Sequence, residues 1–241
     1  MTLRALIFDV DGTLAETEEA HRTAFNESFD DWGLGWHWTR EDYKRLLKTT
    51  GGKERMRVWQ QELPEGAPRL SDAQIAQLHK EKTARYGAIL ARGDLSLRPG
   101  VAELIAAGRA AGLKLAVATT TNLPNVEALS QCCWGRPATE VFDEIAAGDM
   151  VAAKKPAPDV FLLALDKLGL PADDCLAFED SLNGLQSARG AGLRVVMTAS
   201  AYTEDEDHAA ADWRLPSLEA QHLPAPLRAT LAGATAENPA M

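Results

Sequence analysis

Short apolar runs alternate with amphipathic stretches over most of this chain. The apolar runs cover residues 3–8, 113–118, 144–147, 175–178 and 193–197. Helical periodicity marks the stretches between them, at residues 101–111, 123–133, 158–168 and 182–191. Strands that alternate with helices form parallel β-α-β units. We therefore predict an α/β fold built on a doubly wound parallel sheet.

Residues 16–94 interrupt this alternation and contain no strong strand run. The three- and four-residue spacing of one face of an amphipathic helix recurs there, at His21, Phe25, Phe29 and Trp32. Further helical patterns cover 40–48, 53–62 and 71–90. We predict a sheet domain of residues 1–15 and 95–241, with residues 16–94 as a helical insertion that covers the strand ends.

Three smaller features complete this division. Arg98-Pro99-Gly100 marks the return of the chain to the sheet domain, because proline and glycine favour a break before a new helix. The tail from residue 223 carries no clear period, and we assign it no function. The insertion holds four tryptophans, which we expect in its core rather than around a sugar: Trp32, Trp36, Trp38 and Trp59.

Charge and composition exclude several classes of function. The formal net charge of -10 and the pI near 5.0 argue against binding to nucleic acid or to a membrane surface, since both are polyanionic. No run approaches the roughly 18 apolar residues of a membrane span. The cysteines Cys132, Cys133 and Cys175 form no CxxC pair, which favours a reducing compartment. We expect a cytoplasmic monomer.

Two carboxylates directly follow the first predicted strand. The run Asp9-Val10-Asp11-Gly12-Thr13 places Asp9 and Asp11 two residues apart. Carboxylates so placed can reach one pocket, one as nucleophile or metal ligand and the other as acid and base. A simple turn rich in Asp and Gly is the alternative, and the motif alone does not separate the two.

Polar residues also follow three later strands. The run Thr119-Thr120-Thr121-Asn122 begins a helix, where hydroxyls and free N–H groups can hold phosphate oxygens or simply cap the helix. The run Lys154-Lys155-Pro156 can neutralise a phosphate or extend into solvent. The run Phe178-Glu179-Asp180-Ser181 ends an apolar strand with two carboxylates, which suit an oxygen-preferring Mg²⁺ ion.

In order and spacing, these four segments resemble the four motifs of the haloacid dehalogenase superfamily, and the helical insertion resembles its cap. The resemblance implies a Rossmann-like core, Mg²⁺ as cofactor and phosphatase activity. It makes Asp9 the nucleophile that forms an aspartyl-phosphate, and Asp11 the general acid and base. Thr119 and Lys155 match the hydroxyl and the lysine that hold the phosphoryl group. The implied metal site consists of Asp9, the backbone carbonyl of Asp11, Asp180 and, as a ligand or its neighbour, Glu179.

A second anion site is predicted within the insertion. The run Thr49-Thr50-Gly51-Gly52-Lys53-Glu54-Arg55 reads as a loop that enters a helix. Paired glycines permit close approach, the helix start offers free N–H groups, and Lys53 and Arg55 add positive charge. A turn with solvated charges is the alternative. Glu18 and His21 lie near the Asp11 loop in sequence, although acidic residues there also stabilise a helix start.

Longer stretches resemble the CbbY-type subgroup, phosphatases linked to carbon fixation that hydrolyse xylulose 1,5-bisphosphate, an inhibitor of Rubisco. These stretches read AETEEAHRTAFN, TTGGKERM, VATTTNLPNVEAL, IAAGDMVAAKKPAPD and FEDSLNG. The resemblance implies a small-molecule sugar phosphate bound from both parts of the chain. The implied contacts are Glu18, His21, Thr50, Gly51, Gly52, Lys53 and Arg55 of the insertion, and Thr120, Thr121 and Asn122 of the sheet domain.

Other functions stay open on the sequence. Mutases of the β-phosphoglucomutase type return the aspartyl-phosphate to a sugar rather than to water, and catalytic residues alone do not distinguish them. Phosphatases of phosphoglycolate or of hexose monophosphates are a further alternative. A non-catalytic sugar-phosphate-binding module is disfavoured, because Asp9, Asp11 and Asp180 are all present.

Overall fold

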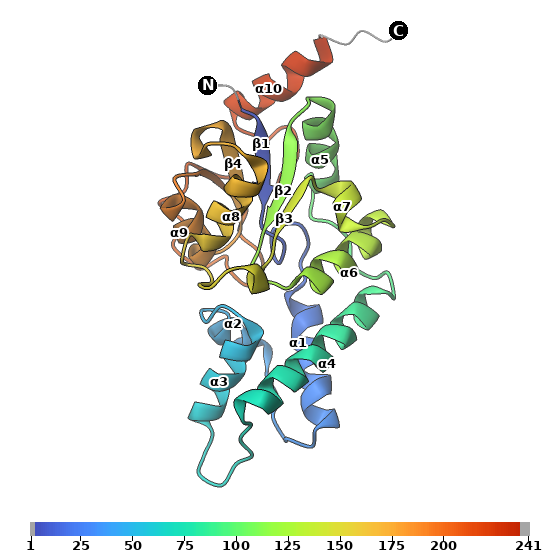
Figure 1. The fold of residues 1–241 in the computed structure, drawn as a ribbon, viewed down its shortest axis with the longest axis vertical. Helices are drawn as coiled ribbons and strands as arrows, with labels where there is room; N and C mark the ends of the chain where they lie inside the picture. The colour runs from blue at the N-terminus through green and yellow to red at the C-terminus, as the bar shows by residue number, and fades with distance from the viewer. Residues whose placement is uncertain (1–2, 237–241) are drawn as a thin grey trace.

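A six-stranded parallel sheet forms the centre of the computed structural model, which describes residues 3–236 (Figure 1). The strand order is β3-β2-β1-β4-β5-β6, and every neighbouring pair is parallel. The strands are β1 (Ala5–Phe8), β2 (Lys114–Ala118), β3 (Glu144–Ala146), β4 (Cys175–Glu179), β5 (Arg194–Met197) and β6 (Trp213–Arg214). The predicted doubly wound α/β fold is confirmed, and the strand order reverses at β1.

Both faces of the sheet are covered by helices, which explains why its strands read as continuous apolar runs. Alternate residues of β1 enter different cores, Leu6 and Phe8 on one face and Ala5 and Ile7 on the other. The first face packs against α5 (Val101–Ala110), α6 (Leu123–Trp134), α7 (Ala138–Val141) and α10 (Ala225–Ala236). The second packs against α8 (Asp159–Leu168) and α9 (Leu182–Gly190).

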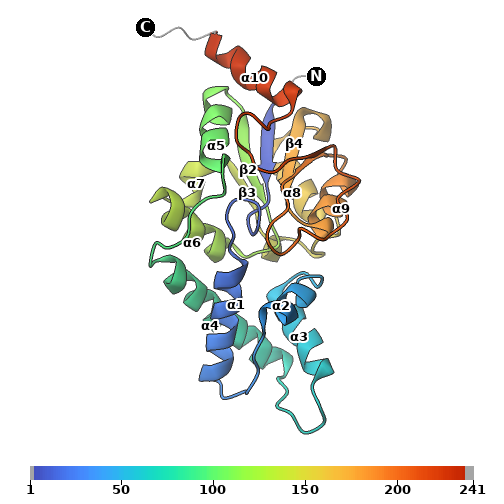
Figure 2. The same ribbon diagram turned by 180° about the vertical axis from the view of Figure 1, so that it is seen from behind.

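The helical insertion lies beyond the carboxyl ends of the strands, as Figures 1 and 2 show. It consists of α1 (Glu18–Asp31), α2 (Arg40–Leu46), α3 (Gly52–Glu62) and α4 (Asp72–Leu90). Capping boxes begin α2 at Thr39 and α4 at Ser71. Trp36 and Trp38 are buried in the apolar cluster of the insertion, and Trp32 and Trp59 pack against it, so their expected core role is confirmed.

The two segments that connect the insertion to the sheet domain run side by side. Ala15 and Leu97 form an antiparallel bridge, and the N–H of Arg98 donates to the carbonyl of Leu14 at 2.8 Å. Within residues 3–236 no helix combines the length and the apolarity needed to cross a membrane.

The sequence patterns did not predict three of the described elements. The tail that carries no clear period contains α10, whose Leu227 is buried against the sheet domain. Strand β6 has two residues, neither of them fully buried, and α7 has four. Such elements are too short to show a period, and α10 is recruited by the apolar surface that it covers.

Candidate active site

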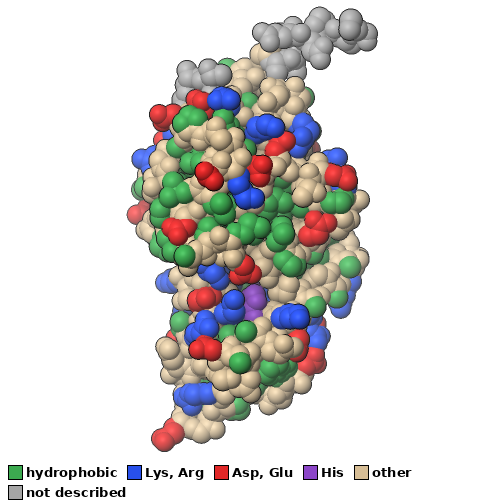
Figure 3. Space-filling model, viewed as in Figure 1, with side chains coloured by type: hydrophobic (Ala, Val, Ile, Leu, Met, Phe, Trp, Pro, Cys, Tyr) green, Lys and Arg blue, Asp and Glu red, His purple; other side chains and the backbone are tan. Residues whose placement is uncertain are grey.

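A cavity of about 940 Å³, open solvent included, lies between the strand ends and the insertion. Figure 3 shows histidine, lysine and arginine side chains gathered at this boundary. Of the predicted residues, the lining includes Asp9, Asp11, Glu18, His21, Thr50, Gly51, Gly52, Arg55, Thr120, Thr121, Asn122, Lys155 and Asp180. Lys53, Thr119 and Glu179 do not line it. Lys154, which the sequence ranked below Lys155, also lines the cavity. The lining further includes residues that the sequence did not single out, among them His79, Lys82, Asn125, Asn183 and Thr203.

Three buried carboxylates meet at the ends of two neighbouring strands. Asp9 follows β1, Glu179 ends β4 and Asp180 follows it. Because β1 pairs with β4 in the register Phe8 to Phe178, each carboxylate offers an oxygen within 4.8 Å of the others. A topological switch point of this kind is where open α/β sheets bind ligands.

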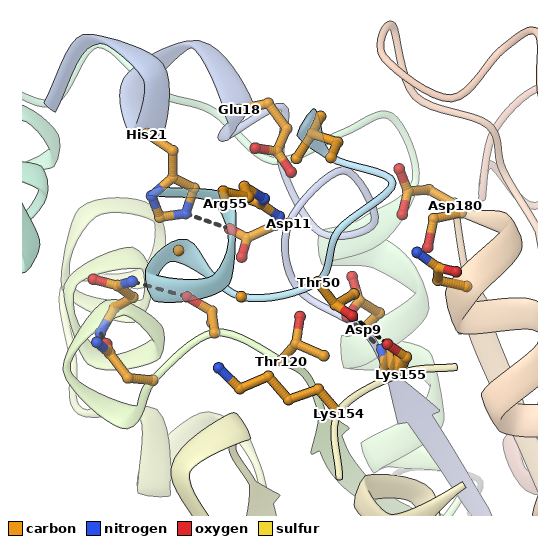
Figure 4. A pocket seen from close by; sticks show the side chains of 18 of the residues that line it. Asp9, Asp11, Glu18, His21, Thr50, Arg55, Thr120, Lys154, Lys155 and Asp180 are labelled. Atoms are coloured by element: carbon orange, nitrogen blue, oxygen red, sulfur yellow. Dashed lines mark hydrogen bonds and ion pairs between the residues drawn. The ribbon is translucent and has the colours of Figure 1, made fainter. Parts of the chain in front are cut away.

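Lys155 brings a single positive charge into this carboxylate cluster. Figure 4 shows it beside Asp9. Its Nζ lies 2.7 Å from Asp9 Oδ1 and 2.5 Å from Glu179 Oε1, and it donates to the carbonyl of Ala118 at 2.9 Å. Burial acts against this charge, but Asp9 and Glu179 outweigh it and raise the pKa of Lys155. The lysine therefore stays charged at neutral pH.

The single positive charge of Lys155 is not enough to neutralise all three carboxylates of the cluster. Burial raises the pKa of Asp9 to about 8, although Lys155 acts in the opposite direction. Burial and the nearby Asp9 raise the pKa of Asp180 well above its ordinary value, and no cationic side chain within residues 3–236 forms an ion pair with Asp180. Buried carboxyls that resist ionisation for lack of positive charge are oxygen donors that fit a divalent cation such as Mg²⁺.

Asp11 takes part in a separate network that reaches into the insertion. Thr17 Oγ1 donates to Asp11 Oδ1 at 2.6 Å, and His21 Nε2 lies 3.0 Å from the same oxygen. On the other side of the imidazole, Lys82 Nζ lies 2.6 Å from His21 Nδ1. The lysine donates to Nδ1, so the ring proton resides on Nε2 and is donated to Asp11.

Protonation states follow from these contacts. Burial acts to raise the pKa of Asp11, but His21 and Thr17 outweigh it and lower that pKa to about 2. Burial and the charge of Lys82 lower the pKa of His21 to about 4, so its ring is neutral at pH 7. Asp11 is therefore ionised, and both nitrogens of His21 already have partners in this structure.

Lys82 could have been found from the sequence. The buried face of α4 follows the spacing Ile75, Leu78, Lys82, Tyr86 and Leu90, which places a lysine where the pattern calls for an apolar residue. Its Nζ lies 4.5 Å from the ring centroid of Phe25, and burial lowers its pKa to about 7. A charged residue on an apolar helix face is a sign of a specific buried partner.

The predicted second anion site faces the cavity from the start of α3. Gly51 has a φ of 98°, a conformation that favours glycine, and it precedes the first N–H groups of the helix. Thr50 Oγ1 donates to the carbonyl of Lys155, which links this loop to the sheet domain. Lys154 rather than Lys53 lines the cavity here, with its Nζ 3.3 Å from Glu54 Oε2.

Glu18 supplies a buried carboxyl on the insertion side. Burial raises its pKa to about 7, against the effects of Arg55 and of a hydrogen bond from Tyr43. Arg55 also donates to Tyr43 Oη at 3.1 Å. Glu18 lines the cavity, and its carboxyl group is suited to accept a hydrogen bond from a hydroxyl group.

In the threonine run at the end of β2, one side chain is buried in the fold and the next lines the cavity. Thr119 is buried, and its Oγ1 accepts a hydrogen bond from the N–H of Thr121 at 3.2 Å. Thr120 and Asn122 reach the cavity, and Asn122 Nδ2 donates to Thr83 Oγ1 of α4 at 3.1 Å. That Thr119 holds a phosphoryl group stays a prediction.

Comparison with known proteins identifies the family. Residues 3–192 match the haloacid dehalogenase-like hydrolase model. Protein CbbY of Rhodobacter capsulatus is 61% identical over 220 residues, which are 91% of this chain and 96% of the relative. The chain belongs to the haloacid dehalogenase-like hydrolases. Within this family it is a phosphatase, an enzyme that hydrolyses phosphoric monoesters.

Solved structures of haloacid dehalogenase-like hydrolases agree with this assignment. CbbY from Rhodobacter sphaeroides in complex with phosphate has a TM-score of 0.87 and 53% identity, covering 90% of this chain and 96% of that chain. A mutant of the same protein, in complex with xylulose 1,5-bisphosphate, gives the same values. A putative β-phosphoglucomutase from Thermotoga maritima, at 23% identity and a TM-score of 0.67, shares the fold alone.

Proposed function

We propose that this phosphatase hydrolyses a sugar bisphosphate, xylulose 1,5-bisphosphate, with Mg²⁺ and an aspartyl-phosphate on Asp9. The observation that carries the proposal is the convergence of two anion-binding regions on one cavity. Asp9 and Lys155 approach it from the sheet domain, while Gly51, Gly52 and Arg55 approach it from the insertion. The relative solved with xylulose 1,5-bisphosphate, at 53% identity, supports this substrate.

The first step is attack by a carboxylate oxygen of Asp9 on phosphorus, with cleavage of the bond between phosphorus and the sugar oxygen. Lys155 would neutralise charge on the transferring group, since its Nζ is already 2.7 Å from Asp9. Mg²⁺ held by Asp9, Asp180, the backbone carbonyl of Asp11 and, directly or through a neighbour, Glu179 would supply further charge neutralisation. It would also favour the ionised form of Asp9 over the protonated form.

Asp11 then has to carry a proton in both directions. An incoming phosphate would raise the pKa of Asp11, because a second negative charge disfavours ionisation. Asp11 would then take up a proton from solvent and could pass it to the departing sugar oxygen. Once the sugar leaves, the hydrogen bonds from Thr17 and His21 again stabilise the carboxylate. In that state Asp11 accepts a proton from the water that attacks the aspartyl-phosphate, which regenerates Asp9 and releases phosphate.

We further propose that residues 16–94 act as a cap that determines substrate choice. The start of α3 would hold the second phosphate. Glu18 and Asn122 would form hydrogen bonds with the sugar hydroxyls between the two phosphates. Binding across both parts would draw them together and exclude bulk water from the reaction.

A panel of phosphate esters tests this function. We expect the highest kcat/KM, measured as phosphate release in Mg²⁺, for xylulose 1,5-bisphosphate, with much lower values for ribulose 1,5-bisphosphate and phosphoglycolate. The two bisphosphates carry equal charge, so their difference measures hydroxyl recognition. Asp9→Asn should abolish release while far-ultraviolet circular dichroism stays unchanged, because an amide is not a nucleophile.

Two results would overturn the proposal. Isomerisation of a sugar phosphate without net phosphate release would indicate a mutase. A clear preference for phosphoglycolate would show that the start of α3 does not select a second phosphate.

A further inference from the structure

Residues 200–208, here called the 200s loop, lie in the connection between β5 and β6 and bury several polar side chains. Ser200, Tyr202, Thr203 and His208 are each at most 6% exposed. Connecting segments normally run over the surface with their polar groups in water. Burial on this scale indicates that the loop is held by specific partners on both sides.

One partner is the helical insertion. The ring of Tyr202 belongs to the apolar cluster of the insertion, and it is the cluster's one buried residue from outside 16–94 within the described chain. It meets Tyr43 edge-on at 5.9 Å between ring centroids, and the guanidinium of Arg40 lies 5.3 Å from its centroid. Its hydroxyl donates to Glu19 of α1. A side chain of the sheet domain thus completes the core of the insertion.

The other partner is the carboxylate cluster. Thr203 directly follows Tyr202, and its Oγ1 donates to Asp180 Oδ2 at 3.2 Å. Ser200 fixes this hydroxyl, because its N–H donates to Thr203 Oγ1 at 2.9 Å and its own hydroxyl lies 3.0 Å away. Asp180 has no cationic side-chain partner within residues 3–236, so these hydroxyls are its main orienting contacts.

We infer that Tyr202 and Thr203 are positioning residues that couple docking of the insertion to the geometry of Asp180. With Tyr202 seated between α1 and α2, Thr203 holds Asp180 Oδ2 and leaves its other oxygen for a divalent cation. Withdrawal of Tyr202 by about 1 Å would stretch the 3.2 Å contact beyond hydrogen-bond range. The inference rests on the proposed function, in which Asp180 is a Mg²⁺ ligand.

Calorimetric titration of the full chain with Mg²⁺ tests this coupling without using turnover. Thr203→Val removes the donor and keeps the side-chain shape, and we expect it to weaken Mg²⁺ binding on the order of 10-fold. Tyr202→Phe should weaken it several-fold, and Tyr202→Ala about as much as Thr203→Val, although Tyr202 does not touch the carboxylates. The double variant Tyr202→Phe/Thr203→Val should bind no worse than Thr203→Val, because both changes act through one hydrogen bond.

Lys44→Ala is the matched control, because the Lys44–Asp205 pair also joins the insertion to the 200s loop, at 2.8 Å, but is accessible to solvent. It should leave Mg²⁺ affinity unchanged. Wild-type affinity in Thr203→Val, or additive losses in the double variant, would overturn the coupling. If Tyr202→Ala does not fold, Tyr202→Phe decides the question, since it keeps the ring. Absence of Mg²⁺ binding by the wild type would instead overturn the proposed function itself.

Discussion

At the scale of single residues, the ammonium group of Lys154 lies where the helical insertion meets the sheet domain. It lines the cavity, and a Cβ atom on Gly51 would stand 2.6 Å from its Nζ. A phosphate at the start of α3 would therefore lie within its reach. We expect Lys154→Ala to lower kcat/KM for xylulose 1,5-bisphosphate in steady-state assays of phosphate release. The expected loss of transition-state stabilisation is about 1.5–3 kcal/mol, the range for loss of a charge-assisted contact.

Lys53→Ala provides the comparison, since it removes the same charge from a side chain outside the lining. Its effect should be much smaller, and phosphoglycolate should respond weakly to both changes because it lacks a second phosphate. Equal losses for Lys53→Ala and Lys154→Ala would show that the lysine at the start of α3 also contacts the substrate.

At the scale of elements, helix α9 approaches the end of β4 closely enough that position 184 admits no side chain. A Cβ atom on Gly184 would lie 2.0 Å from Glu179 Cδ, inside any real contact distance. Gly184→Ala must therefore displace Glu179 or α9. We expect it to reduce the free energy of unfolding by about 1–3 kcal/mol, measured by urea denaturation, and to weaken Mg²⁺ binding as well.

Gly233→Ala in α10 is the matched helix control. Nothing lies within 4 Å of the added Cβ atom, so the substitution should be neutral or stabilise by up to about 1 kcal/mol through its higher helix propensity. A Gly184→Ala protein as stable as the wild type would mean that α9 and β4 are packed less tightly than described.

At the scale of the whole molecule, the carboxylate cluster makes stability depend on pH and metal together. The pKa of Asp9 is raised from 3.8 to about 8 on folding, so the folded chain binds this proton more firmly than the unfolded chain. The stability that Asp9 contributes therefore falls as pH rises from about 4 to about 8. Mg²⁺ binds the ionised form, so the increase in Tm that Mg²⁺ produces over chelator should be larger at pH 8 than at pH 5.

Differential scanning calorimetry at both pH values measures this increment in Tm. The variant Asp9→Asn tests whether the titration of Asp9 causes its pH dependence. Since an amide does not titrate, the pH dependence of the increment should shrink in that variant. An increment of equal size at pH 5 and pH 8 in the wild type would contradict the raised pKa of Asp9.

The sequence by itself determined the fold class and most of the groups around the cavity. Apolar runs stopped by polar residues are local features, and strands of a parallel sheet end at one edge, so Asp9, Glu179 and Asp180 had to meet once the strands were recognised. The helical spacing of residues 16–94 likewise identified an insertion with its own core.

Only the tertiary structure decided which side chains face the cavity. Lys154 faces it and Lys53 does not, Lys82 reaches His21 across 61 positions, and Tyr202 enters the core of the insertion. These side-chain positions depend on how the insertion packs against the sheet domain, and no local sequence pattern predicts that packing. Strand β6 and helix α10 form for the same reason. Pairing with β5 stabilises β6, and the apolar surface that α10 covers stabilises α10, whereas neither has a clear pattern of its own.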